Sequence, residues 1–335
     1  MRISITMSMF SGQIGCNGYE PNRTIRHQQI TGLLLPRPGI LRGGNKIWEF
    51  AWKRLINYWK NGGCIMNKKY TLNELLIIAA AREIHDDENV ILGVGLPTTA
   101  GALAKALHAP HANLMMESGI IDFEPLVQPN HIADAMSCRG FSCSTDLFTA
   151  FTMTYRGFVD VCFLGVGQID KFGNLNTTCL GDYNSPDLRL PGSGGAADFI
   201  SYAKRTILTL RGGDFVEKLD YFTSPGYLEG GDAREKSGLY CPGSGPSMLI
   251  TQKGIFKFDE VTKEMYLAQK HPLISLEDIQ AEIPWELKVA DDLTETDPPS
   301  QEEIEFIRRF APAEALGRSL MRELAINNLF KEMSK

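Results

Sequence analysis

Four mostly apolar runs constrain the fold of this chain more than any other feature of its sequence. They cover residues 89–94, 113–117, 158–165 and 205–210. Runs of this length are typical of strands that are covered on both faces, as in a parallel sheet. Because segments with helical periodicity lie between them, the runs predict a chain that alternates strands and helices.

The first predicted helix is amphipathic and covers residues 71–85, where Thr71 and Glu74 have the spacing of a capping box. Pro97 fits the first turn of the next helix, at residues 98–107. The other predicted elements are helices at residues 145–155, 198–203, 275–283, 301–310 and 313–331, and strands at 248–251, 254–259 and 265–268, the first two paired. We therefore expect a single α/β domain over residues 66–335, with a largely parallel buried sheet and helices on both faces.

The distribution of charge changes abruptly near Met66. Residues 1–65 carry nine lysines and arginines and two acidic residues, a net +7, so the formal charge of −6 for the whole chain leaves −13 for the rest. Trp48, Trp52 and Trp59 recur at helical spacing in this basic segment, as in a helix that rests on an anionic membrane. The alternative, which we favour because a strong helix signal follows Met66, is a non-native or disordered extension translated from an upstream region.

The composition argues against several kinds of site and partner. Among the seven cysteines, Cys138 and Cys143 are five positions apart with no second pair or nearby histidine at ligand spacing, so we expect no metal site. The odd number and irregular spacing predict buried thiols in a reducing cytoplasm. No segment has the roughly 18–20 apolar residues that span a membrane, and the acidic charge of residues 66–335 argues against nucleic-acid binding.

Two glycine-rich segments are candidate binding loops. Gly93, Val94 and Gly95 lie between a predicted strand and a predicted helix, where backbone N–H groups can bind phosphate. The pattern alone favours a tight strand–helix turn, because the third glycine of a dinucleotide-binding fingerprint is absent. Gly194 and Gly195 precede another predicted helix and can direct N–H groups at a developing oxyanion, unless they belong to a plain surface loop.

Glu117 ends the apolar run at 113–117 and is followed by Ser118 and Gly119. A carboxylate at the carboxyl end of a buried strand is costly to desolvate unless it is paired or used in chemistry. A partly dry position suits a nucleophilic glutamate, and the adjacent glycine leaves room for a substrate. The alternative is an acid that caps the backbone or forms an ion pair at the strand end.

Seven ordered segments carry a resemblance to a known family. They are Gly93-Val94-Gly95-Leu96-Pro97, Met116-Glu117-Ser118-Gly119, Gly167-Gln168-Ile169-Asp170 with Gly173-Asn174, Gly181-Asp182-Tyr183, Gly192-Ser193-Gly194-Gly195-Ala196, Asp220-Tyr221-Phe222-Thr223-Ser224-Pro225-Gly226 and Gly254-Ile255-Phe256-Lys257-Phe258-Asp259. With these segments, the chain from about residue 67 to residue 310 resembles the B (beta) subunit of family I CoA-transferases, in particular that of glutaconate CoA-transferase. Residues 1–65 lie outside the resemblance.

The resemblance implies that Glu117 is a nucleophile that moves CoA between an acyl-CoA and a free, glutaconate-like acid. It would form an acyl-glutamyl anhydride and then a glutamyl-CoA thioester, which predicts ping-pong kinetics. We assign the oxyanions of these steps to the N–H groups of Gly194 and Gly195. In the family, the turn at residues 93–97 lies near the CoA.

The resemblance also implies what the chain needs in order to work. The CoA thioester is a substrate, and no metal or redox cofactor is required. The active site lies at the interface with the A (alpha) subunit, which is a separate chain of similar fold in a hetero-oligomer. This chain alone is therefore expected to be inactive.

Two other functions fit parts of the sequence. Hydrolases of the same fold open a ring of a steroid-derived acyl-CoA, but they lack the glutamate that is present here as Glu117. A non-catalytic subunit is the other candidate, and the intact Glu117 and both glycine segments count against it. The sequence does not identify the acceptor acid, although Arg139 and Arg156 are candidates for binding a second carboxylate.

Overall fold

The computed structural model describes residues 70–238, 241 and 243–316, so residues 1–65 and most of the predicted helix at 313–331 lie outside the described residues. The helices are α2 (Leu72–Arg82), α3 (Leu96–Leu107), the 3₁₀ helix η1 (Ala135–Cys138), α4 (Leu147–Tyr155), α5 (Ala196–Tyr202), α6 (Ala233–Lys236), α7 (Leu276–Gln280), α8 (Gln301–Phe310) and α9 (Pro312–Leu316). The strands are β1 (Asn89–Leu92), β2 (Asn113–Met116), β3 (Ile120–Ile121), β4 (Cys143–Ser144), β5 (Val161–Gly165), β6 (Gln168–Ile169), β7 (Leu175–Asn176), β8 (Cys179–Asp182), β9 (Ser185–Arg189), β10 (Arg205–Leu210), β11 (Asp214–Phe215), β12 (Pro246–Thr251), β13 (Gly254–Phe258), β14 (Met265–Lys270) and β15 (Val289–Glu295).

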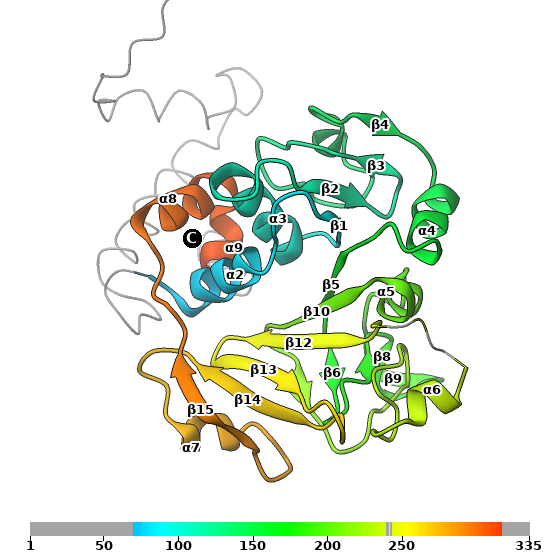
Figure 1. The fold of residues 1–335 in the computed structure, drawn as a ribbon, viewed down its shortest axis with the longest axis vertical. Helices are drawn as coiled ribbons and strands as arrows, with labels where there is room; N and C mark the ends of the chain where they lie inside the picture. The colour runs from blue at the N-terminus through cyan, green and yellow to red at the C-terminus, as the bar shows by residue number, and fades with distance from the viewer. Residues whose placement is uncertain (1–69, 239–240, 242, 317–335) are drawn as a thin grey trace, which may run out of the picture. The chain divides into compact units, whose positions relative to one another are not determined.

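A ten-stranded sheet organises the described residues (Figure 1), in the order β15-β14-β13-β12-β10-β5-β1-β2-β3-β4. Its middle strands β2, β1, β5, β10 and β12 are parallel to one another. Antiparallel pairs occur only toward the two ends, among them the predicted pair of β12 and β13. The prediction of a largely parallel α/β sheet is therefore confirmed.

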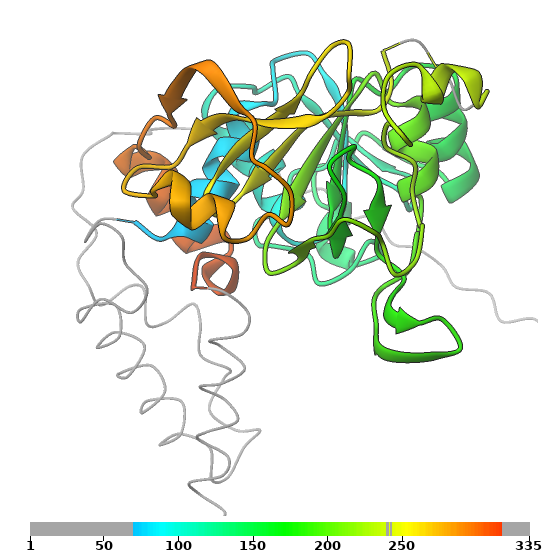
Figure 2. The same ribbon diagram turned by 90° about the horizontal axis from the view of Figure 1, so that it is seen from below.

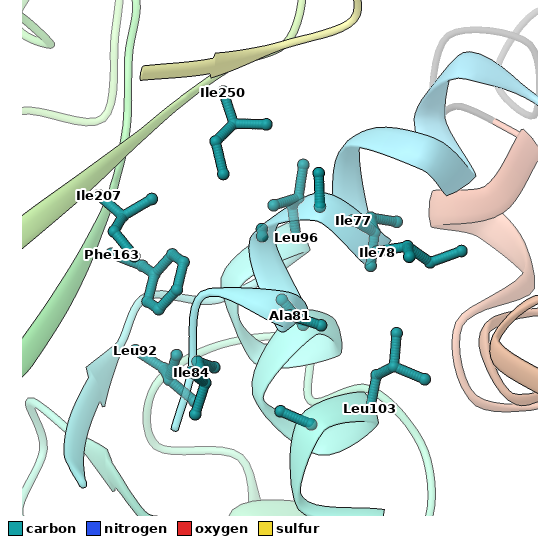
Figure 3. Packing of buried hydrophobic residues seen from close by; sticks show 14 of the residues in the cluster. Ile77, Ile78, Ala81, Ile84, Leu92, Leu96, Leu103, Phe163, Ile207 and Ile250 are labelled. Atoms are coloured by element: carbon teal, nitrogen blue, oxygen red, sulfur yellow. The ribbon is translucent and has the colours of Figure 1, made fainter. Parts of the chain in front are cut away.

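Each buried strand contributes to two cores, because successive side chains point to opposite faces of a sheet. In β5, Phe163 belongs to the core cluster that contains α2 and α3, whereas Cys162 belongs to the cluster that contains α5. Figure 3 shows part of the first cluster, with Phe163 and Ile207 of the sheet and Ile77 of α2 among its apolar side chains. Helices thus cover both faces, which explains why the apolar runs show no alternation.

The start of α2 is as predicted, but its burial is not. The Thr71 side chain accepts the N–H of Glu74 at 3.1 Å, and the Glu74 carboxylate accepts the N–H of Thr71 at 2.8 Å, so the capping box is present. Residues 74–81 are all buried, because α3, α8, α9 and the sheet pack around the helix. The prediction of an amphipathic helix is therefore wrong, and α2 is a core helix.

The cysteines only partly follow the prediction of buried thiols. Cys162 and Cys179 are buried and free, but Cys138 and Cys143 are exposed because η1 and the edge strand β4 carry them. Among the described residues, no group of three histidines, cysteines or acids is placed to hold a metal ion. No helix in the same part of the chain is long and apolar enough to cross a membrane.

The buried histidine His271 makes the stability of the fold depend on pH. One ring nitrogen lies 2.9 Å from the carbonyl of Thr251, and the other lies 2.9 Å from the hydroxyl of Thr296. Burial lowers the pKa of His271 from 6.5 to about 4. Between these values the unfolded chain binds a proton that the folded chain does not, so the stability contribution is complete above pH 6.5 and is lost as the pH falls toward 4.

Between pH 6.5 and pH 4, we expect the free energy of unfolding of the wild-type chain to fall by about 3 kcal/mol more than that of a His271→Asn variant. The asparagine cannot titrate, so the variant lacks this contribution. Urea unfolding of both proteins at a series of pH values measures the difference. A difference that stays constant from neutral pH to pH 4 would contradict this account of His271.

Candidate active site

Glu117 lies at the carboxyl end of β2, on the edge where the parallel strands of the sheet end. The three residues before it are buried, and Glu117 itself is half-buried. The N–H of Gly119 donates to the carbonyl of Met116 at 3.0 Å, so the chain turns directly after the glutamate. The carboxylate is therefore held beside the strand end.

Gly119 fixes this turn through close packing of two backbone segments. Its φ is +95°, a conformation that favours glycine, and a Cβ at this position would lie 2.7 Å from the carbonyl carbon of Thr145. The Gly119 carbonyl also accepts the N–H of Thr145 at 2.8 Å. A larger residue would therefore displace the turn that positions Glu117.

The second glycine segment lies against Glu117, although 78 positions separate Gly195 from it. The N–H of Gly195 donates to Oε2 of Glu117 at 3.4 Å, and a Cβ on Gly194 would lie 3.6 Å from Oε1. Gly195 directly precedes α5, and a Cβ on it would lie 2.4 Å from the ring of Phe199. The fold thus brings together the predicted nucleophile and the predicted oxyanion donors, which is not expected of a plain surface loop.

A cavity of about 70 Å³ lies between these segments and is lined by Glu117, Gly93, Gly195 and side chains of β1, β5 and α5. Most of its lining is apolar, which strengthens the interaction of a developing charge with nearby N–H groups. Burial raises the pKa of the Cys162 thiol well above its usual range, and the Glu117 carboxylate raises it further. The thiol therefore stays protonated, and Glu117 is the acidic side chain among the residues that line the cavity.

The residues of the first glycine segment, Gly93 to Gly95, have different roles. Gly93 lines the cavity beside Glu117, whereas Val94 and Gly95 lie outside its lining. Gly95 has φ +97° and ψ −127°, which glycine alone adopts readily, and its carbonyl accepts the N–H of Thr99 at 3.1 Å. Gly95 is therefore explained by the turn that begins α3, and Gly93 alone is placed to meet a ligand near the glutamate.

Another motif segment, residues 167–174, forms a hydrogen-bond network that joins loops. The Asp170 carboxylate accepts the N–H groups of Phe172 at 2.9 Å and Asn174 at 3.0 Å. The Asn174 side chain in turn accepts the N–H groups of Gly226 at 2.8 Å and Leu228 at 3.1 Å. These residues therefore stabilise the loop after β6 and are not part of the cavity.

The arginines proposed for carboxylate binding are engaged elsewhere. Arg139 donates to the carbonyl of Glu124 at 2.8 Å, and the Arg156 guanidinium lies 5.4 Å from the centre of the Phe158 ring. Conversely, the sequence did not single out Cys162 as a cavity residue. Its pairing across the sheet with Ile91 of β1, which also lines the cavity, is the signal that could have identified it.

Fold and site together define an α/β protein in which a strand-end carboxylate faces a glycine-rich helix start across an apolar cavity. The model of the coenzyme A transferase family matches residues 73–282. The chain is 37% identical over 244 residues to the B (beta) subunit of 3-oxoadipate CoA-transferase of Pseudomonas knackmussii, covering 71% of this chain and 92% of that protein. It is 35% identical over 246 residues to the B (beta) subunit of glutaconate CoA-transferase of Acidaminococcus fermentans, covering 71% and 91%.

A solved structure agrees with these sequence comparisons. The crystal structure of glutaconate coenzyme A-transferase from Acidaminococcus fermentans superimposes with a TM-score of 0.68 at 33% identity, over 74% of this chain and 97% of that chain. The chain therefore belongs to the coenzyme A transferase family, as the resemblance predicted.

Proposed function

We propose that the chain is the beta subunit of a CoA-transferase that moves CoA between an acyl-CoA and a free carboxylic acid, with Glu117 as the nucleophile. The observation that carries the proposal is the position of the Glu117 carboxylate, which lies 3.4 Å from the Gly195 N–H and lines an apolar cavity. A carboxylate that is only partly solvated and faces a fixed N–H donor suits acyl transfer.

The reaction needs two exchanges at the same carboxyl group. A carboxylate oxygen of Glu117 attacks the thioester carbonyl, the C–S bond breaks, and CoA leaves as a thiolate from an acyl-glutamyl anhydride. The thiolate then attacks the glutamyl carbonyl, releasing the donor acid and leaving a glutamyl-CoA thioester. The acceptor carboxylate runs both exchanges in reverse, so thioester energy is kept without a metal or a redox cofactor.

Each attack places negative charge on a carbonyl oxygen beside Glu117. The N–H of Gly195, with that of Gly194 adjacent, is the proposed donor, because a fixed dipole in an apolar cavity needs no reorganisation. Gly93 has no side chain and also lines the cavity. We place the CoA thioester there, next to the turn formed by Val94 and Gly95.

The relatives support a proposal for the acceptor and for the partner. One is named for 3-oxoadipate and the other for glutaconate, and both acids are dicarboxylates. Both relatives are beta subunits, so we propose that this chain works with an alpha subunit in a hetero-oligomer and takes a dicarboxylic acid as acceptor or donor. The cations that bind the second carboxylate would then come from the alpha subunit.

Initial-rate kinetics of the chain co-expressed with its alpha subunit test the proposed function. We expect transfer that requires both an acyl-CoA and an acceptor acid, with the parallel double-reciprocal plots of a ping-pong mechanism. Opening of a ring in a cyclic acyl-CoA without any acceptor, with the CoA thioester still attached to the product, would instead favour the ring-opening hydrolase alternative. Full transfer by a Glu117→Ala complex would favour the alternative of a non-catalytic subunit.

Replacing Gly195 by alanine tests the proposed oxyanion donor. The new Cβ would lie 2.4 Å from the Phe199 ring, so the segment must shift away from Glu117. We expect kcat to fall by about 10²–10³-fold, the usual effect of losing one such donor. Gly165→Ala is the control, because that glycine has no positive φ and no atom within 4 Å of its Cβ position. Equal rates for the two variants would contradict the assignment.

A further inference from the structure

A buried arginine outside the cavity, Arg234 of α6, has no place in the proposed chemistry. It is only 3% exposed. Its Nη1 donates to the carbonyls of Pro225 at 3.0 Å and Gly226 at 2.6 Å. Its Nη2 donates to the carbonyl of Ile200 at 2.8 Å and to the hydroxyl of Ser244 at 3.2 Å. One guanidinium therefore joins three separate segments of the chain through four neutral oxygens.

Burying the charge of Arg234 in this way is costly. Burial lowers the pKa of its guanidinium, the direction expected of a cation taken out of water. Among the described residues, no carboxylate forms an ion pair with it, and its Nε has no hydrogen-bond partner. A buried cation that is bound only by neutral groups loses much of its solvation without the return of an ion pair. Stability alone therefore does not account for Arg234.

Arg234 holds the C-terminal end of α5. Figure 1 and Figure 2 show α6 (yellow-green) near α5 (green), and the bond to Ile200 joins the two helices. If α5 continued, the N–H of Lys204 would bond to the Ile200 carbonyl, but it donates instead to the carbonyl of Val159 at 3.2 Å. Arg234 supplies the missing donor, and its charge faces the negative end of the helix dipole.

The opposite end of α5 carries the proposed oxyanion donor. The carbonyl of Gly195 accepts the N–H of Phe199 at 2.9 Å, and the N–H of Gly195 donates to Glu117 at 3.4 Å. At the rise of an α-helix, the five positions from Gly195 to Ile200 span about 8 Å. A helix of seven residues is marginal by itself, so contacts at its ends fix its position. A shift of the Ile200 carbonyl would therefore move the donor relative to Glu117.

The other contacts of Arg234 attach its guanidinium to packed backbone. A Cβ on Gly226 would clash with the backbone of Gly173, and the N–H of Gly226 donates to the Asn174 side chain at 2.8 Å. Gly226 ends the motif segment at residues 220–226, which lies outside the cavity lining. Through Arg234, this segment becomes the fixed point to which the end of α5 is attached.

We propose that Arg234 is a positioning residue, which ties the end of α5 to the loop at residues 225–226 and so sets the distance between the Gly195 N–H and Glu117. The inference rests on the proposed function, which makes this N–H the donor to the oxyanion. It adds a role for a buried charge and for a motif segment that do not reach the cavity.

Two variants of Arg234 and a matched arginine elsewhere test the proposal. Arg234→Lys keeps the charge, but a single ammonium group cannot span the positions of Nη1 and Nη2. Arg234→Met removes every donor. Arg82→Lys is the control, because Arg82 also donates to two backbone carbonyls, of Asp297 at 2.8 Å and Pro298 at 3.1 Å, and none of these residues lines the cavity. Steady-state kinetics of each complex with the alpha subunit are measured at a temperature where urea unfolding shows that the variant is folded.

We expect kcat to fall about 10-fold in Arg234→Lys and about 100-fold in Arg234→Met, with KM within about 2-fold of the wild-type value, because a misplaced donor acts on the transition state. Arg82→Lys should keep the wild-type kcat. In a Gly195→Ala background, Arg234→Lys should lower kcat by less than about 3-fold, because both changes displace the same N–H. A wild-type kcat in Arg234→Lys, an equal loss in Arg82→Lys, or a full 10-fold loss in the Gly195→Ala background would overturn the proposal.

Amide exchange in the same complexes separates this inference from the proposed function. We expect exchange at residues 195–199 to be at least about 10-fold faster in Arg234→Lys than in the wild type, and unchanged in Arg82→Lys. This result in a complex that transfers no CoA would support the attachment of α5 by Arg234 and contradict the function. Transfer at the wild-type rate by the Arg234→Lys complex would support the function and contradict the inference. Unchanged exchange at residues 195–199 in Arg234→Lys would also overturn the inference.

Discussion

Replacing Glu117 by glutamine is expected to lower the rate of CoA transfer by at least about 10⁴-fold, because an amide cannot form the anhydride. Stability should change by less than about 1 kcal/mol, because the carboxylate is half-buried and its one hydrogen bond to a backbone N–H is long, at 3.4 Å. The variant should therefore fold, assemble with the alpha subunit, and fail only in chemistry. Single-turnover assays of the purified complex measure the rate.

Two controls define the result for Glu117. Glu117→Asp keeps the carboxylate but shortens the side chain by one methylene, so we expect a loss of about 10²-fold from misplacement alone. Glu260→Gln removes an exposed carboxylate and should have no effect on the rate. Transfer at the wild-type rate by the Glu117→Gln complex would rule out a covalent role for this residue.

Replacing Glu74 by alanine is expected to lower the free energy of unfolding by about 3–5 kcal/mol. Glu74 is only 1% exposed and accepts hydrogen bonds from Arg308 at 2.6 Å and 3.1 Å, as well as from the backbone N–H of Thr71 at 2.8 Å. One carboxylate therefore caps α2 and joins it to α8. Its loss removes both the cap and the ion-pair partner of a largely buried guanidinium.

Chemical unfolding of Glu74→Ala beside a matched surface variant measures this effect. Asp232→Ala removes the partner of Lys236 from an ion pair in which both side chains are more than half exposed, so it should cost less than about 1 kcal/mol. The double variant Glu74→Leu with Arg308→Met should recover part of the stability, because it removes both charges of this pair together. Equal losses for Glu74→Ala and Asp232→Ala would show that burial does not set the strength of the Glu74 pair.

Local sequence signals predicted those parts of the structure that depend on local physics. The capping box at Thr71 and the position of Pro97 define helix starts, because both act within one turn of backbone. The apolar runs predicted parallel strands because burial on both faces removes alternation. Glu117 was singled out for a similar reason, since a carboxylate directly after a buried strand is costly unless it is used.

The remaining features depend on contacts between distant parts of the chain. The burial of α2 results from packing against α3, β12, α8 and α9. The last two helices follow α2 by more than two hundred residues, and no pattern within α2 shows those contacts. The approach of Gly195 to Glu117 depends on how β5 to β9 bring the chain back to the sheet edge. Asn174 and Gly195 both lie in glycine-rich polar loops, and the fold shows that the first joins loops, whereas the N–H of the second lies 3.4 Å from the glutamate.

Trapping the intermediate tests the central claim, the nucleophilic role of Glu117, most directly. The complex with the alpha subunit is incubated with an acyl-CoA, reduced with borohydride, digested and mapped by mass spectrometry. We expect the carboxyl group of Glu117 to be reduced to a primary alcohol, because a glutamyl thioester is reducible and a free carboxylate is not. A complex that turns over at its full rate while the peptide containing Glu117 stays unmodified would contradict the account.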